Sequence, residues 1–145
     1  EFEREFADFV GVKHAVALGN GTLALDVALN ALGIGPGDEV VVTPRTFLAS
    51  VSCVVTAGAT PVFADVNRDT QNLSAETIKS AITPRTRAIM PVHIYGHPVD
   101  MDPILALAQQ HVPVILEDAA GVHGDDGGSG GAVRGGSAGG GAARF

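Results

Sequence analysis

The sequence is poor in the residues on which several classes of protein depend. Its 145 residues include one cysteine and no tryptophan, which excludes an internal disulfide framework. Nine basic residues stand against sixteen acidic ones, and the net charge of −7 leaves no basic run to neutralise nucleic-acid phosphates. No apolar run is long enough to cross a membrane, and the first residues lack the layout of a secretion signal. We therefore expect a cytoplasmic protein with neither nucleic-acid nor membrane partners.

Apolar residues, in contrast, are abundant. They make up 46% of the chain, and the mean hydropathy of +0.26 is high for a free-standing soluble domain. We interpret the chain as a piece of a larger protein whose faces are covered. Cys53 lies inside the apolar segment 49–58, where we expect a packed core thiol rather than a nucleophile.

Predicted strands and helices alternate over most of the chain. Short apolar runs predict strands at 14–20, 38–44, 60–66, 87–93 and 112–118. The segments between them predict helices at 21–33, 45–58, 74–82 and 101–111, with Ser74 as an N-cap and Gly58 as a terminator. Continuously apolar strands separated by helices indicate a mostly parallel sheet with helices on both faces, which is an α/β fold.

The composition changes from Gly124 onward. Residues 124–145 are rich in glycine and offer almost nothing to bury, which is typical of flexible coil. The segment is either a linker or loop sequence that needs further parts of the protein. We expect one organised unit over 1–123 and a disordered tail over 124–145.

Four residues with distinctive chemistry follow the predicted strands. Gly21 and Thr22, in "GNGT", open a helix whose N-terminal N–H groups suit a phosphate, although such glycine turns are also common without a ligand. Phe47, in "TPRTF", is either a flat binding surface or an ordinary core residue. Asp118 ends "VPVILED", and a carboxylate at such a place needs a partner. Ligands gather beyond the carboxyl ends of parallel strands, so we expect these residues at one edge of the sheet.

A phosphate site, an aromatic surface and a carboxylate together fit pyridoxal 5′-phosphate (PLP). The phosphate needs the helix N-terminus, the flat ring needs an aromatic neighbour, and the pyridinium nitrogen needs an aspartate. Asp118 would then have the cofactor as its partner.

A further loop carries His93, Tyr95 and His97. The spacing of the two histidines, without a neighbouring carboxylate, does not favour a metal site. We expect hydrogen-bonded structure there and no bound metal.

The sequence also resembles the DegT/DnrJ/EryC1/StrS family of PLP-dependent sugar aminotransferases. The matching pieces occur in family order over residues 1 to about 124: "EFADFVGVKHAVALGNGTLAL", "GDEVVVTPRTFLAS", "GATPVFADVNRDTQN", "AITPRTRAIMPVHIYGHPVDMDPI" and "VPVILEDAAGVHG". The resemblance implies the N-terminal part of a fold-type-I large domain, like that of aspartate aminotransferase. It implies that Gly21 and Thr22 bind the PLP phosphate, that Phe47 stacks on the ring and that Asp118 contacts the pyridine nitrogen. It also implies a homodimer that takes nucleotide-sugar and amino-acid substrates.

The chain departs from the family pattern at two places. Gly121 stands where the family usually has glutamine or histidine, and a contact on the ring-oxygen side is thereby lost. The family's Schiff-base lysine has no counterpart, because the only lysines are Lys13 and Lys79. We therefore assign no catalytic residue and expect the chain alone to be inactive.

Other interpretations remain open. The chain could be an inert fragment or a half-domain that needs a partner. A sugar dehydratase of the same fold, with histidine in place of the lysine, is a further alternative. A nicotinamide-dependent oxidoreductase has the same fold class, but only Gly19 and Gly21 fit its glycine fingerprint and its acidic ribose anchor is missing.

Overall fold

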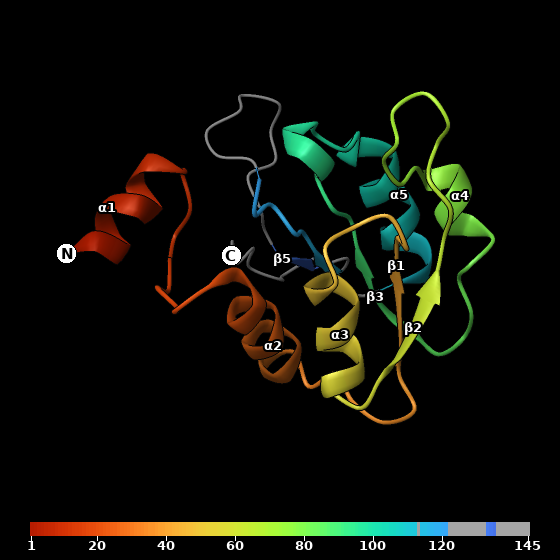
Figure 1. The fold of residues 1–145 in the computed structure, drawn as a ribbon, viewed down its shortest axis with the longest axis horizontal. Helices are drawn as coiled ribbons and strands as arrows, with labels where there is room; N and C mark the ends of the chain where they lie inside the picture. Colours follow the sequence, from red (N-terminus) through yellow and green to blue (C-terminus); the bar gives the residue numbers. More distant parts are fainter. Residues whose placement is uncertain (113, 122–132, 136–145) are drawn as a thin grey trace.

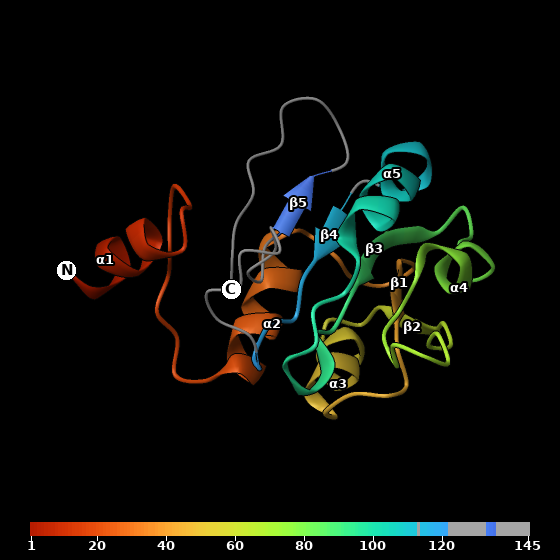
Figure 2. The ribbon, with the colours of Figure 1, turned by 90° about the horizontal axis from the view of Figure 1, so that it is seen from above.

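A computed structural model of the chain describes residues 1–112, 114–121 and, for the backbone alone, 133–135. Its centre is a sheet with the strand order β2-β1-β3-β4-β5 (Figure 2). Strands β1 to β4 are parallel to one another, and β5 is antiparallel to β4. The strands are β1 (Glu39–Val42), β2 (Thr60–Phe63), β3 (Thr86–Met90), β4 (Val114–Leu116) and β5 (Val133–Gly135).

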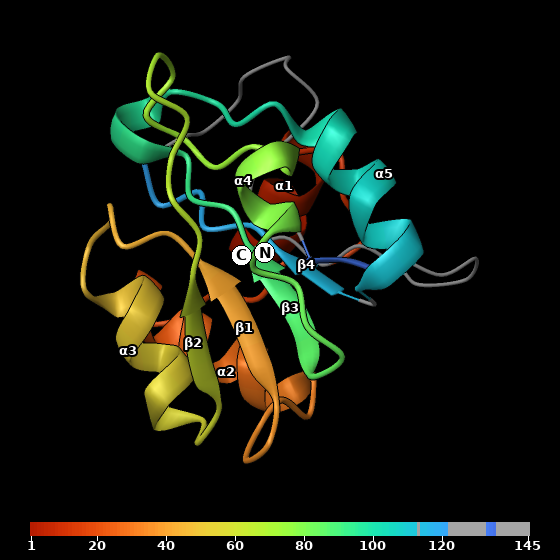
Figure 3. The same ribbon diagram turned by 90° about the vertical axis from the view of Figure 1, so that its right-hand side faces the viewer.

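Helices cover both faces of the sheet, as the apolar strands predict. The helices are α1 (Phe2–Phe9), α2 (Gly21–Ala31), α3 (Ala49–Thr56), α4 (Ala75–Lys79), α5 (Met101–His111) and the short 3-10 helix η1 (Ile94–Gly96). Helices α2 and α3 lie on one face, and α4 and α5 lie on the other (Figure 3). The α1 helix stands apart from the sheet (Figures 1 and 2). The α/β prediction is confirmed.

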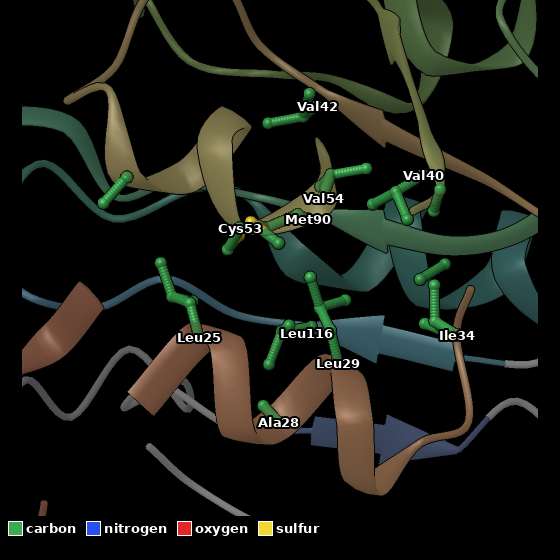
Figure 4. Close-up of a cluster of buried hydrophobic side chains, with 13 residues drawn as sticks. Leu25, Ala28, Leu29, Ile34, Val40, Val42, Cys53, Val54, Met90 and Leu116 are labelled. Atoms are coloured by element: carbon green, nitrogen blue, oxygen red, sulfur yellow. The ribbon is translucent and has the colours of Figure 1, made fainter. Parts of the chain in front are cut away.

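Two apolar clusters hold these layers together. Leu25 and Leu29 of α2 pack with Val40, Met90 and Leu116 of the sheet (Figure 4). On the opposite face, side chains of α4 and α5 pack on the alternate strand positions, namely Val41, Ile89 and Ile115. Successive strand residues therefore point into different clusters, and both faces of the sheet are buried.

The predicted helix ends agree with the structure at two places. The Ser74 hydroxyl accepts a hydrogen bond from the Thr77 N–H, and the Thr77 hydroxyl accepts one from the Ser74 N–H. Gly58 follows α3 with φ +80°, and the Ala59 N–H reaches back to the Val54 carbonyl at 3.1 Å. A left-handed residue at this place favours glycine, which explains why the helix ends there.

Two predicted elements differ from those observed. Residues 14–20 form no strand, since a strand needs a neighbour to pair with and the described residues supply none for this segment. The Ala17 N–H instead donates to a carboxylate oxygen of Glu3 at 2.8 Å. The helix expected over 45–58 begins only at Ala49, because the preceding residues form a turn at the edge of the sheet.

The glycine-rich tail expected over 124–145 lies mostly outside the described residues. Within it the structure describes only β5, whose backbone pairs with β4.

Candidate cofactor site

A pocket of about 310 Å³ opens at the carboxyl ends of the parallel strands. Its volume falls within the range of about 300–1,000 Å³ that is usual for small-molecule sites. Four segments form its wall: the start of α2, the turn before α3, the loop after β3 and the residues after β4. The pocket is lined by Gly21, Thr22, Leu25, Thr46, Phe47, Ala49, Val92, His93, Ile94, Tyr95, Asp118, Ala120 and Gly121. All four residues predicted to bind the cofactor are among them, although they come from three distant segments of the sequence.

The N-terminus of α2 presents backbone donors to this pocket. Asn20 is the N-cap, and its side-chain oxygen accepts a hydrogen bond from the Leu23 N–H at 2.9 Å. The first N–H groups of a helix have no partner within the helix, so those of Gly21 and Thr22 are left to a ligand or to solvent. A Cβ atom at Gly21 would lie 4.0 Å from that of Ala120. Small residues therefore bring this helix end close to the segment after β4.

Phe47 lies in the turn between β1 and α3. Its side chain is 75% exposed, so it is not a core residue among the described parts of the chain. The Phe47 carbonyl accepts a hydrogen bond from the Ser50 N–H at 3.2 Å, and this bond ties the turn to the first residues of α3. The Phe47 ring lines the pocket and makes few contacts with the rest of the described chain.

Asp118 is placed by an extension of the sheet. A single parallel bridge joins Val92 to Asp118, where the Asp118 N–H donates to the Pro91 carbonyl at 2.9 Å and the His93 N–H donates to the Asp118 carbonyl at 3.1 Å. The alternation of side chains along this extended backbone separates the two adjacent carboxylates. Asp118 lines the pocket, whereas Glu117 is fully buried.

Two donors hold the half-buried Asp118 carboxylate. The Ser50 hydroxyl donates to Oδ2 at 2.7 Å, and the Ala120 N–H donates to Oδ1 at 3.3 Å. The Ser50 oxygen also lies 2.8 Å from the Thr46 hydroxyl oxygen. Sequence analysis missed both hydroxyl residues. The only local signal is that Thr46 and Ser50 are four residues apart, with Phe47 between them.

The three residues of the loop after β3 have different surroundings. His93 is 2% exposed; its Nδ1 accepts a hydrogen bond from the Val99 N–H at 2.9 Å, and its Nε2 lies 3.5 Å from a carboxylate oxygen of Glu117. Tyr95 is exposed with φ +54°, and the Arg45 guanidinium lies 5.9 Å from its ring centroid. The His97 carbonyl accepts from the Asn72 side chain at 2.9 Å. His93 and His97 are thus hydrogen-bonded, as expected, and the loop that carries them forms part of the pocket wall.

Gly121 also lines the pocket. A Cβ atom there would lie 3.5 Å from the Gly96 nitrogen and 3.8 Å from the His93 carbonyl oxygen, which are ordinary contact distances. The backbone thus has room for a side chain where the resembled family usually carries one.

Neither lysine is part of the pocket lining. Lys13 is exposed in the segment after α1, and Lys79 is exposed at the end of α4. The pocket as described therefore contains backbone donors, hydroxyls, the rings of Phe47, Tyr95 and His93 and the carboxylate of Asp118, but no lysine amine.

Comparison with known proteins identifies the family to which the chain is similar. Residues 1–139 match the model of the DegT/DnrJ/EryC1/StrS aminotransferase family. GDP-perosamine synthase of Caulobacter vibrioides is 57% identical over 120 residues, which are 83% of this chain and 32% of that protein. A transaminase of Streptomyces venezuelae, dTDP-3-amino-3,4,6-trideoxy-alpha-D-glucose transaminase, is 50% identical over 123 residues, covering 85% of this chain and 32% of that protein.

Solved structures agree with the sequence comparison. NtdA from Bacillus subtilis, with bound cofactor PMP, is 35% identical with a TM-score of 0.78, and the match covers 81% of this chain and 27% of that chain. The chain thus spans about a third of the length of the curated relatives that it matches. It belongs to the DegT/DnrJ/EryC1/StrS aminotransferase family.

Proposed function

We propose that the pocket binds PLP and that the protein uses it to transfer an amino group from an amino-acid donor to a keto group of a nucleotide-linked sugar. One observation carries the proposal: Gly21, Thr22, Phe47 and Asp118, from three separate segments, line a single pocket. The names of the relatives support the reaction, since one makes a GDP-linked amino sugar and another is a transaminase of a dTDP-linked sugar.

The residues present fit the cofactor at three points. The N–H groups of Gly21 and Thr22, with the Thr22 hydroxyl, would hold the phosphate at the positive end of α2. Phe47 would cover one face of the ring. Asp118 would accept a hydrogen bond from the pyridine nitrogen and keep it protonated. PLP, when bound, supplies the electron sink that amino transfer requires.

The phosphate contact can be tested with two ligands that differ only in that group. We expect the chain to bind pyridoxamine 5′-phosphate (PMP) more tightly than pyridoxamine by about tenfold or more, because only PMP engages the helix N-terminus. Thr22→Val should reduce this preference. The matched control is Thr56→Val, which changes an exposed threonine at the far end of α3. Equal binding of the two ligands would contradict the phosphate assignment.

Covalent attachment is not expected for the chain by itself. Lys13 and Lys79 are the only lysines and neither lines the pocket. After incubation with PLP and reduction with borohydride, mass spectrometry should find no stoichiometric adduct. A stoichiometric adduct on either lysine that also supported amino transfer would contradict the proposed site.

The reaction itself needs a lysine-bearing form of the protein. Incubated with a keto nucleotide-sugar and L-glutamate, this form should produce the amino sugar and 2-oxoglutarate in equal amounts. Loss of water from the sugar without amine incorporation would instead support the dehydratase alternative.

We also propose that the protein works as a homodimer with its active sites near the subunit interface. Apolar side chains on the outer surfaces of α2 and α3, including Leu23, Val27 and Val55, are 41–60% exposed. Exposed apolar surface promotes association, so we expect the purified chain to self-associate in light-scattering measurements. A monodisperse monomer would contradict this expectation.

None of the helices within the described residues combines the length and apolar character that a membrane crossing requires.

A further inference from the structure

Ser50 lies between the turn that carries Phe47 and the carboxylate of Asp118. Its side chain is fully buried, although it belongs to the first turn of α3 and follows an exposed stretch of chain. Its oxygen is 2.7 Å from Asp118 Oδ2 and 2.8 Å from the Thr46 hydroxyl oxygen. A buried hydroxyl with two polar neighbours at these distances makes both hydrogen bonds.

The direction of these two bonds follows from counting protons. An ionised carboxylate can only accept, so the single hydroxyl proton of Ser50 must be donated to Asp118. The Ser50 oxygen then has only lone pairs left, and the Thr46 hydroxyl must donate to it. The Thr46 hydroxyl therefore donates to Ser50, and the Ser50 hydroxyl donates to Asp118.

This arrangement fixes the plane of the carboxylate. The Ser50 hydroxyl occupies one acceptor site on Oδ2, and the Ala120 N–H occupies one on Oδ1. A carboxylate has about four acceptor sites, so sites on both oxygens remain for a ligand. Ser50 sits behind the carboxylate, since Asp118 lines the pocket and Ser50 does not.

We propose that Ser50, supported by Thr46, is a positioning residue that holds the Asp118 carboxylate in the orientation needed to pair with the cofactor's pyridine nitrogen. This inference rests on the proposed function. The turn that presents Phe47 to the ring is thereby coupled to the group that binds the ring nitrogen, because the Phe47 carbonyl also accepts the Ser50 N–H.

The test uses PMP, which needs no lysine, with a ¹⁵N label at the pyridine nitrogen. Ser50→Ala should weaken PMP binding about tenfold, because the Asp118 carboxylate loses one of the two donors that hold its orientation and must be ordered when the ligand binds. It should also move the pyridine ¹⁵N chemical shift at neutral pH toward that of the unprotonated ring. Ser50→Thr, which keeps the hydroxyl, should restore both values. The matched control is Ser52→Ala, on the same helix and outside the pocket lining, which should leave both unchanged.

The outcomes separate this inference from the proposed function. If Asp118→Asn changes the pyridine shift and Ser50→Ala does not, the positioning role of Ser50 is wrong and the role of Asp118 stands. If neither substitution changes it, or if the unsubstituted chain does not bind PMP, the proposed function fails first. Should Ser50→Ala unfold, Thr46→Val removes the outer hydroxyl without touching the core. It should give a smaller loss in the same direction, and a wild-type shift and affinity would overturn the inference.

Discussion

Replacing Asp118 by asparagine should weaken cofactor binding while leaving the fold intact. The side chain keeps its shape and is only half-buried, so packing changes little. The carboxylate accepts from the Ser50 hydroxyl on one oxygen and from the Ala120 N–H on the other. An amide can accept at only one of these places and must donate at the other, so the hydrogen bond with the Ser50 hydroxyl would have to reverse its direction. The negative charge that would pair with the pyridinium is lost as well.

The magnitude follows from two contributions. A hydrogen bond to a charged group contributes about 1.5–3 kcal/mol, against about 0.5–1.5 kcal/mol for a neutral one. Two unit charges about 4 Å apart attract by about 4 kcal/mol at an effective dielectric constant of about 20. Solvent screens this attraction at the half-buried Asp118. We therefore expect a loss of about 2 kcal/mol, which corresponds to about 30-fold weaker binding of PMP.

The assay is a titration of the chain with PMP, read by fluorescence or calorimetry. The matched control is Asp102→Asn, an exposed aspartate on α5 at the opposite face of the sheet, which should bind PMP like the unsubstituted chain. In a lysine-bearing form, the same Asp118 substitution should lower the rate of amino transfer by about two decades or more. An Asp118→Asn chain that binds PMP within about threefold of wild type would show that Asp118 does not pair with the pyridine nitrogen.

Three further predictions concern groups outside the pocket. Burial, with the nearby Asp26 and Asp118 charges, raises the pKa of Cys53 to about 12, so iodoacetamide should label it at neutral pH only as fast as the chain unfolds; rapid labelling in buffer would contradict this. The hydrogen bond from Thr83 and the charge of Arg85 hold the pKa of Glu39 below its ordinary value. Because folding lowers this pKa, ionised Glu39 stabilises the folded chain at pH values above the pKa of the unfolded chain. This stabilisation is lost as the pH falls through the pKa of the folded chain. Glu39→Gln should therefore lower the free energy of unfolding in urea at neutral pH, and the difference from the unsubstituted chain should vanish in acid. Leu29→Ala, at a fully buried position, should cost about 2–5 kcal/mol in the same urea assay, whereas Leu48→Ala, at a 72% exposed position, should cost less than about 0.5 kcal/mol.

The apolar runs predict most of the sheet because both of its faces are buried. Val40, Val41 and Val42 are each fully buried, alternately in the two clusters, so the whole strand is apolar and is recognised without any knowledge of its neighbours. The segment 14–20 has the same apolar character, but hydrophobicity does not reveal whether a partner strand is available. Local pattern specifies burial, and pairing depends on the rest of the chain.

In the candidate site too, some residues could be predicted from the local sequence and others could not. Phe47 follows β1 and Asp118 follows β4, so strand topology predicts that these two residues meet. Gly21 and Thr22 join them at the start of α2, although the strand predicted before them at 14–20 does not form. Ser50 could not be found in this way, because its partner Asp118 is 68 residues further along the chain. Their contact exists only after α3 has packed beside the end of the extended β4 segment. Thr46 was missed for a different reason, because the helix predicted over 45–58 includes the turn in which Thr46 lies, whereas α3 begins only at Ala49.

We propose above that the N-terminus of α2 and the residues after β4 form one cofactor site. The most direct measurement is an NMR titration of the ¹⁵N-labelled chain with PMP, followed at the backbone amides. We expect saturable shifts concentrated at Gly21, Thr22 and Ala120, with the amides of α4 and α5 unchanged. Shifts confined to α4 and α5, or none at any PMP concentration that the chain tolerates, would contradict it.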